Sequence, residues 1–66
     1  MKKQNRVVTK CLTEKNKLIR FSFLLTHDLT CCEYEKNDEY SCIWLNGQQY
    51  IITMSMYDLE TLICNL

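Results

Sequence analysis

Hydrophobic positions in this sequence fall into short runs that polar residues separate, and the clearest separation is Asn46-Gly47. The run Ser41–Leu45 precedes this dipeptide and Gln48–Met54 follows it, and both contain the β-branched and aromatic residues that favour strands. Asn-Gly accepts the positive φ angles that both central residues of a type I′ turn require. We therefore expect a β-hairpin with Asn46-Gly47 as its two-residue turn.

Three further strands are expected upstream of this hairpin. Leu18–Leu25 alternates with a period of two, which is the period of a strand with one buried face. Cys31–Glu35 and Glu39–Cys42 flank Asn37-Asp38, two residues that tolerate turn geometry, so they predict a second hairpin. Arg6–Thr13 is rich in β-branched residues and predicts a first strand.

The end of the chain predicts a helix of about three turns. Ser55 precedes Asp58 by three residues, as in a capping box at a helix start. Apolar residues then recur with helical spacing on one side, with Leu62 next to them: Met56, Leu59, Ile63 and Leu66. This stripe is expected to pack on the sheet.

Placing turns at Lys15-Asn16, His27-Asp28, Asn37-Asp38 and Asn46-Gly47 joins the strands in sequence order. The expected fold is an α+β domain, an antiparallel β-meander of four to five strands, open or curled toward a partial barrel, with the helix on one face. A slip of one residue would invert a strand. The face under the helix then collects Val8, Leu12, Ile19, Phe21, Phe23, Leu25, Cys32, Tyr34, Ile43, Leu45, Tyr50, Ile52 and Met54.

Length and composition indicate one small domain over residues 1–66. The chain has no proline and one glycine, and 47% of its residues are hydrophobic while 24% are charged, which is ordinary for a globular protein. We see no repeat or linker. A core of this size supplies only about 3–5 kcal/mol of stability, so small domains often add a disulfide, a metal or a second subunit.

The face opposite the helix is not purely polar, and it is the candidate partner-binding site. Tyrosine and tryptophan are enriched in protein interfaces, and exposed apolar patches often mark binding sites. The alternative is a second core face that the first strand covers by curling over it. The expected site residues are Tyr40, Cys42, Trp44 and Ile51, with Cys31, Glu33 and Glu35 on the same side.

Charge is unevenly distributed, although the net charge is zero. Residues 1–20 carry a net charge of about +6 and residues 21–66 about −6. A basic cluster can contact phosphates, so nucleic-acid binding is the alternative function, and Glu33 and Glu35 would oppose it. Lysines can also simply protect a sheet edge. The candidate nucleic-acid residues are Lys10, Lys15, Lys17 and Arg20, with Lys2, Lys3 and Arg6 nearby.

Nothing in the sequence indicates catalysis, a cofactor or a metal. The five cysteines are odd in number and lack the C-x2-C spacing of zinc modules, so we expect free thiols. His27-Asp28 could orient a general base, but turn residues are the simpler interpretation, because no catalytic motif accompanies the pair. We expect that the protein is not an enzyme.

The expected location is the cytoplasm, because the start of the sequence lacks the apolar region of a signal peptide and no run is long enough to cross a membrane. In its lysine-, asparagine- and isoleucine-rich composition the chain is similar to small accessory proteins of phages and mobile elements, many of which inhibit a host protein. We expect a small, dimeric protein-binding module that acts as an inhibitor or regulator.

Overall fold

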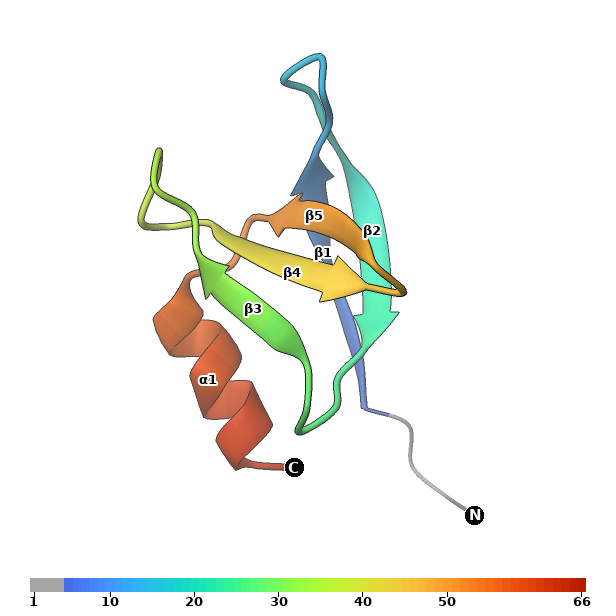
Figure 1. Cartoon of the computed structure of the whole chain (residues 1–66), viewed down its shortest axis with the longest axis vertical. Coiled ribbons are helices and arrows are strands. Elements are labelled where there is room, and N and C mark those ends of the chain that lie inside the picture. Colours follow the sequence, from blue (N-terminus) through green and yellow to red (C-terminus); the bar gives the residue numbers. More distant parts are fainter. Residues whose placement is uncertain (1–4) are drawn as a thin grey trace.

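Five antiparallel strands and one C-terminal helix form the fold in the computed structural model, which describes residues 5–66 (Figure 1). This matches the expected α+β architecture, and the sheet does not close into a barrel. The elements are β1 Arg6–Leu12, β2 Leu18–Leu24, β3 Thr30–Glu33, β4 Ser41–Leu45, β5 Gln48–Ile52 and α1 Met56–Cys64.

The strand order is β2-β1-β5-β4-β3, so the strands are not all neighbours in sequence order. The expected turn at His27-Asp28 does not pair the strands on either side of it. Instead, residues 25–29 lead from β2 at one edge to β3 at the other, along the bottom of Figure 1. The reason is a long-range pairing, in which Cys11 and Leu12 of β1 lie opposite Ile52 and Ile51 of β5.

The loop between β1 and β2 is one residue longer than a two-residue turn. Asn16 has a φ of 60°, its N–H donates to the Thr13 carbonyl at 2.9 Å, and the Thr13 N–H donates to the Lys17 carbonyl at 2.8 Å. This three-residue loop, with a left-handed residue at its end, is a common hairpin connection. It shifts the expected register by one, so that Val7 lies opposite Phe23 and Cys11 opposite Ile19.

This shift inverts β1. Val7 is buried and Val8 is 61% exposed, so the prediction that Val8 and Leu12 face the helix is wrong. Their side chains lie on the opposite face of the sheet, because neighbouring residues of a strand point to opposite sides.

The loop between β3 and β4 shifts its hairpin by one residue as well. Its residues 34–40 contain two successive turns, and the Glu39 N–H donates to the Asn37 side-chain oxygen at 2.9 Å. Cys31 therefore lies opposite Ile43, and Cys32 lies opposite Cys42. The expectation that Cys32 and Tyr34 share the helix-covered face with Ile43 is wrong, and Cys31 and Glu33 are there instead.

The hairpin of β4 and β5 has the predicted turn. Asn46 and Gly47 have φ angles of 52° and 80°, and Leu45 lies opposite Gln48. Both central residues are thus left-handed, as a type I′ turn requires.

The core lies between the sheet and α1. The helix begins as predicted, because the Ser55 hydroxyl accepts a hydrogen bond from the Asp58 N–H at 3.2 Å. Leu59 is fully buried, Met56, Ile63 and Leu66 pack against the core, and Leu62 remains 39% exposed. The buried apolar residues of this core cluster are Val7, Cys11, Phe23, Leu25, Ile43, Ile52 and Leu59.

Candidate binding face

The sheet surface opposite α1, here called the free face, carries a row of apolar side chains that crosses all five strands. Each member of the row lies directly opposite the next one in the neighbouring strand. Side chains at such positions are close enough to contact one another across the strands. From β3 to β2, the row is Cys32, Cys42, Ile51, Leu12 and Leu18.

Three of the predicted interface residues come from one strand segment. Tyr40, Cys42 and Trp44 occupy alternate positions in and just before β4, and Ile51 lies opposite Cys42, so all four share the free face. Cys42 is only 4% exposed, whereas Tyr40, Trp44 and Ile51 are half-buried. Tyr40, Trp44 and Ile51 are therefore the solvent-accessible side chains of this group, and Cys42 is not accessible.

Glu33, one of the two acidic residues predicted for this site, is not part of it. Glu33 lies opposite Ser41, which places it on the helix-covered side of the sheet, and Glu35 is exposed in the loop that follows β3. The prediction for Glu33 is wrong because it depended on the β3 register, which the longer loop shifts by one residue. The Glu33 carboxylate, which was expected to repel a phosphate backbone, thus lies away from the free face.

Residues of the β1–β2 hairpin extend the free face, and the sequence pattern did not assign them to it. Val8, Leu12 and Leu18 lie on this side, and Leu18 is 46% exposed. Asn16 is the residue in the sequence that could have indicated this register, because an asparagine in a polar loop can take the left-handed conformation that lengthens the turn.

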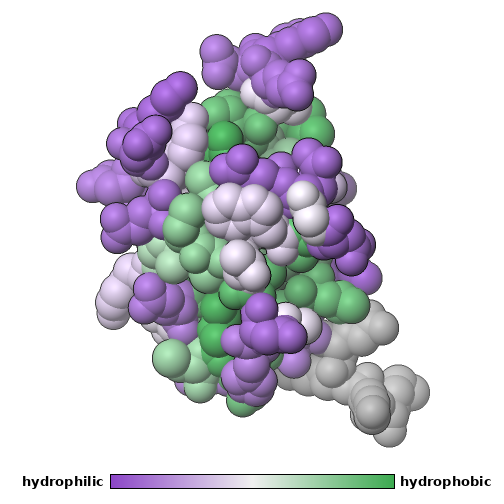
Figure 2. Space-filling model, in the orientation of Figure 1, coloured by the Kyte–Doolittle hydropathy of each residue, from purple (hydrophilic) through white to green (hydrophobic). Residues whose placement is uncertain are grey.

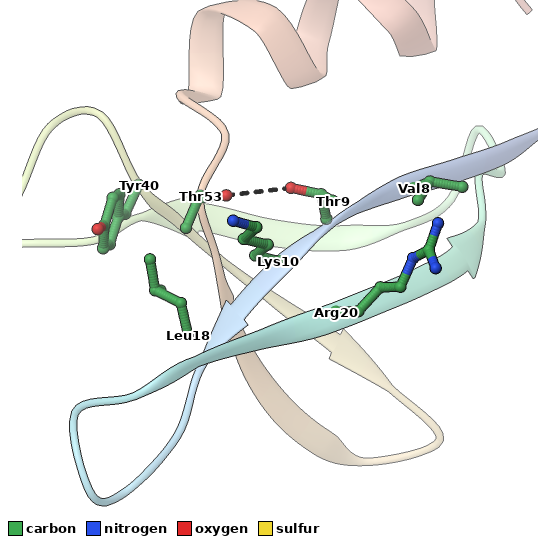
Figure 3. A pocket seen from close by; sticks show the side chains of 7 residues that line it. All are labelled: Val8, Thr9, Lys10, Leu18, Arg20, Tyr40 and Thr53. Atoms are coloured by element: carbon green, nitrogen blue, oxygen red, sulfur yellow. Dashed lines mark hydrogen bonds between the residues drawn. The ribbon is translucent and has the colours of Figure 1, made fainter.

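A shallow depression lies where this hairpin approaches Tyr40 (Figure 3). Thr9 and Thr53 are joined by a hydrogen bond of 3.2 Å between their hydroxyl oxygens. In the close-up, Tyr40 and Leu18 lie on one side, Val8 and Arg20 lie on the other, and Lys10 lies between these two groups. The lining residues are Val8, Thr9, Lys10, Leu18, Arg20, Tyr40 and Thr53.

The candidate basic residues divide into two groups. Lys10 and Arg20 lie opposite each other on the free face, whereas Lys15 and Lys17 are exposed at the hairpin tip. Arg6 donates to the Ser22 hydroxyl at 3.3 Å. Lys2 and Lys3 lie outside the described residues.

In the space-filling view, apolar surface lies between the polar hairpin tip and the polar β3–β4 loop (Figure 2).

Among the remaining reactive residues, Cys32 and Cys42 lie opposite each other in neighbouring strands. The five cysteines are unpaired thiols, and no group of three or more potential metal ligands occurs within residues 5–66. Burial, followed by the nearby Glu60 carboxylate, raises the pKa of Cys31, while desolvation and then the neighbouring Cys42 raise the pKa of Cys32. His27 and Asp28 are exposed in the loop after β2.

Comparisons with protein-family models, with curated proteins and with solved structures found no match for this chain. Within the described part of the chain, no helix has the length and the apolar character needed to cross a membrane.

Proposed function

We propose that this protein is a small, non-enzymatic protein-binding module that acts as a cytoplasmic inhibitor or regulator and contacts its target through the free face. The observation that carries this proposal is the apolar row across all five strands, which α1 does not cover because the helix packs on the opposite side. Tyr40 and Trp44 add aromatic side chains of the kind that anchor protein interfaces.

The charges on this face indicate the chemistry of the target. Lys10 and Arg20 lie beside the exposed apolar side chains of Val8 and Leu18. A complementary surface would present apolar side chains together with carboxylates, because opposite charges guide association and favour the matching partner. We therefore propose an acidic and apolar target surface.

The test uses substitutions of exposed residues, which leave the fold intact. The wild-type chain would capture its target from the cell that produces it, and calorimetry with the purified target would then measure affinity. Leu18→Glu should weaken binding at least roughly tenfold, because it introduces a charge into the apolar contact. The matched control is Tyr57→Glu, on the 80%-exposed residue of α1, which should leave affinity unchanged.

Equal affinity of wild type and Leu18→Glu would contradict the proposal. Trp44→Ala provides a second test, because it should reduce the free energy of binding by more than it reduces the free energy of unfolding, which thermal melts report. The reverse result, with full affinity and strong destabilisation, would identify Trp44 as ordinary core.

Single-stranded nucleic acid is the second candidate, and one arrangement favours it. Lys10 and Arg20 lie opposite each other in the depression beside Tyr40, and Glu33 is on the other side of the sheet. A cationic groove with an aromatic ring is typical of single-strand binding. Fluorescence anisotropy at several salt concentrations tests it, because phosphate contacts require a steep salt dependence. Lys10→Glu with Arg20→Glu should abolish such binding, and Lys36→Glu should not.

A further inference from the structure

β2 is an edge strand whose outer side has no partner within residues 5–66. It is seven residues long, and Arg20 is its one charged residue. Leu18, Ile19 and Leu24 are between 46% and 50% exposed. The other edge strand, β3, has four residues and ends at Glu33, and α1 lies alongside it (Figure 1). Long, apolar edge strands readily pair with another chain, and natural proteins usually shorten or charge them.

Hydrogen bonds at both ends of the β1–β2 ladder determine which backbone groups are free. Thr13 donates to the Lys17 carbonyl, and Leu25 donates to the Asn5 carbonyl. Hydrogen-bonded pairs alternate along an antiparallel ladder, so the odd-numbered residues of β2 bond to β1. The outward-pointing N–H and C=O groups belong to Leu18, Arg20, Ser22 and Leu24.

We propose that β2 pairs antiparallel with β2 of a second copy of this chain, about a two-fold axis at Phe21. In this register Leu18 lies opposite Leu24 of the second copy and Arg20 lies opposite Ser22, so the whole strand is paired. The backbone N–H and C=O groups of all these residues point outward, so each pair can form the hydrogen bonds of an antiparallel ladder. A two-fold axis at Arg20 would instead place two arginines opposite each other, which is destabilising.

A hollow next to β2 supports the second copy of this chain as the partner of that strand. Phe21, Phe23, Leu45 and Tyr50 line it on the helix-covered side of the sheet. Ile19 lies on the same side but is half exposed in its own chain. In the proposed register, Ile19 of the second copy lies opposite Phe23, at a pair without hydrogen bonds, where side chains approach most closely. Its side chain would enter this hollow.

The dimer would also enlarge the free face. Antiparallel pairing of identical edges places the two-fold axis perpendicular to the sheet, so the free faces of both copies lie on the same side. Five strands from each copy form one continuous sheet. The dimer stands independently of the proposed function, because its test measures self-association and needs no target.

Sedimentation equilibrium under reducing conditions tests the dimer. The expected mass is roughly twice the 7.9 kDa of the chain. Ser22→Pro removes an outward N–H at a position where an edge strand tolerates proline. Since two-fold symmetry removes this bond twice, the dissociation constant should rise by roughly tenfold or more. Ser22→Ala is the matched control, because both variants lose the hydroxyl that accepts from Arg6, and it should still form dimers.

Isotope-filtered NOEs on a mixed labelled and unlabelled wild-type sample provide a measurement that needs no variant. Contacts between Ile19 of one copy and Phe23 of the other are expected, because these residues are four positions apart within one extended strand and too distant to contact each other there. A monomer at all concentrations, a larger assembly, or a dimer without this contact would overturn the proposal.

Discussion

Asn16 determines which side of β1 faces the core. With Asn16 at a φ of 60°, the β1–β2 loop has three residues instead of two. In the resulting register Val7 and Cys11 lie in the core, and Val8 is exposed. Asparagine tolerates the left-handed region better than other residues with a side chain, whereas β-branched residues are strained there.

Asn16→Val should therefore destabilise the fold by about 1–2 kcal/mol, because a β-branched side chain at positive φ clashes with the backbone. Asn16→Gly should be close to neutral, since glycine has no Cβ. Urea unfolding of both variants measures this difference. Equal stability of the two variants would mean that the loop does not depend on a left-handed residue.

Cys32 allows a test by pH. Desolvation and the neighbouring Cys42 raise the pKa of its thiol above the ordinary value of 9.0. The thiolate is the reactive form, so alkylation of Cys32 should be slower in the folded protein than in urea at pH 8, and its rate should still increase above pH 9. Mass spectrometry after iodoacetamide treatment follows each cysteine separately. Equal rates at pH 8 in the folded protein and in urea would contradict the shift.

The strand pattern predicted some of the candidate site but not all of it. Tyr40, Cys42 and Trp44 share a face because side chains alternate along one strand, and this does not depend on any pairing. Glu33, by contrast, reaches a face only through its register with β4. The longer β3–β4 loop shifts this register by one residue and places Glu33 on the other side of the sheet, and the loop sequence does not specify that register.

At the scale of the elements, local sequence signals predicted the helix and the β4–β5 hairpin, but they did not predict the strand order. Ser55 and Asn46-Gly47 act within a few residues of themselves, so they can be identified directly in the sequence. The β1–β5 contact joins residues about 40 positions apart, such as Cys11 and Ile52. No local pattern encodes such a pairing, so β2 and β3 were expected to be neighbours.

Two adjacent valines test the register of β1. Val7→Ala should destabilise the fold by roughly 2 kcal/mol, because it removes buried methyl groups and leaves a cavity. Val8→Ala should change stability by no more than about 0.5 kcal/mol, because Val8 is 61% exposed. Denaturant unfolding compares the two, and each variant is the control for the other. A larger loss for Val8→Ala would restore the register expected from a two-residue turn.

At the scale of the whole molecule, a core cluster that includes Leu59 of the helix joins the two ends of the sheet. β1 and β5 pair directly over only two residue pairs, so the backbone ladder between the β1–β2 hairpin and the other three strands is short. Leu59 belongs to a core cluster that includes residues of β1, β2, β4 and β5: Val7, Cys11, Phe23, Ile43 and Ile52. Helix and sheet should therefore unfold as one unit.

Leu59→Ala should consequently unfold much of the molecule. Truncating a fully buried leucine costs about 2–5 kcal/mol, which approaches the total stability expected for a core of this size. Leu62→Ala makes the same change on the same helix at a 39%-exposed side chain, so it shares the change in helix propensity and should cost less than about 1 kcal/mol. Circular dichroism melts should show the helix and sheet signals of Leu59→Ala lost together at a lower temperature. If the sheet signal persisted after the helix signal had disappeared, the sheet would be stable without α1, and the helix would not join its two parts.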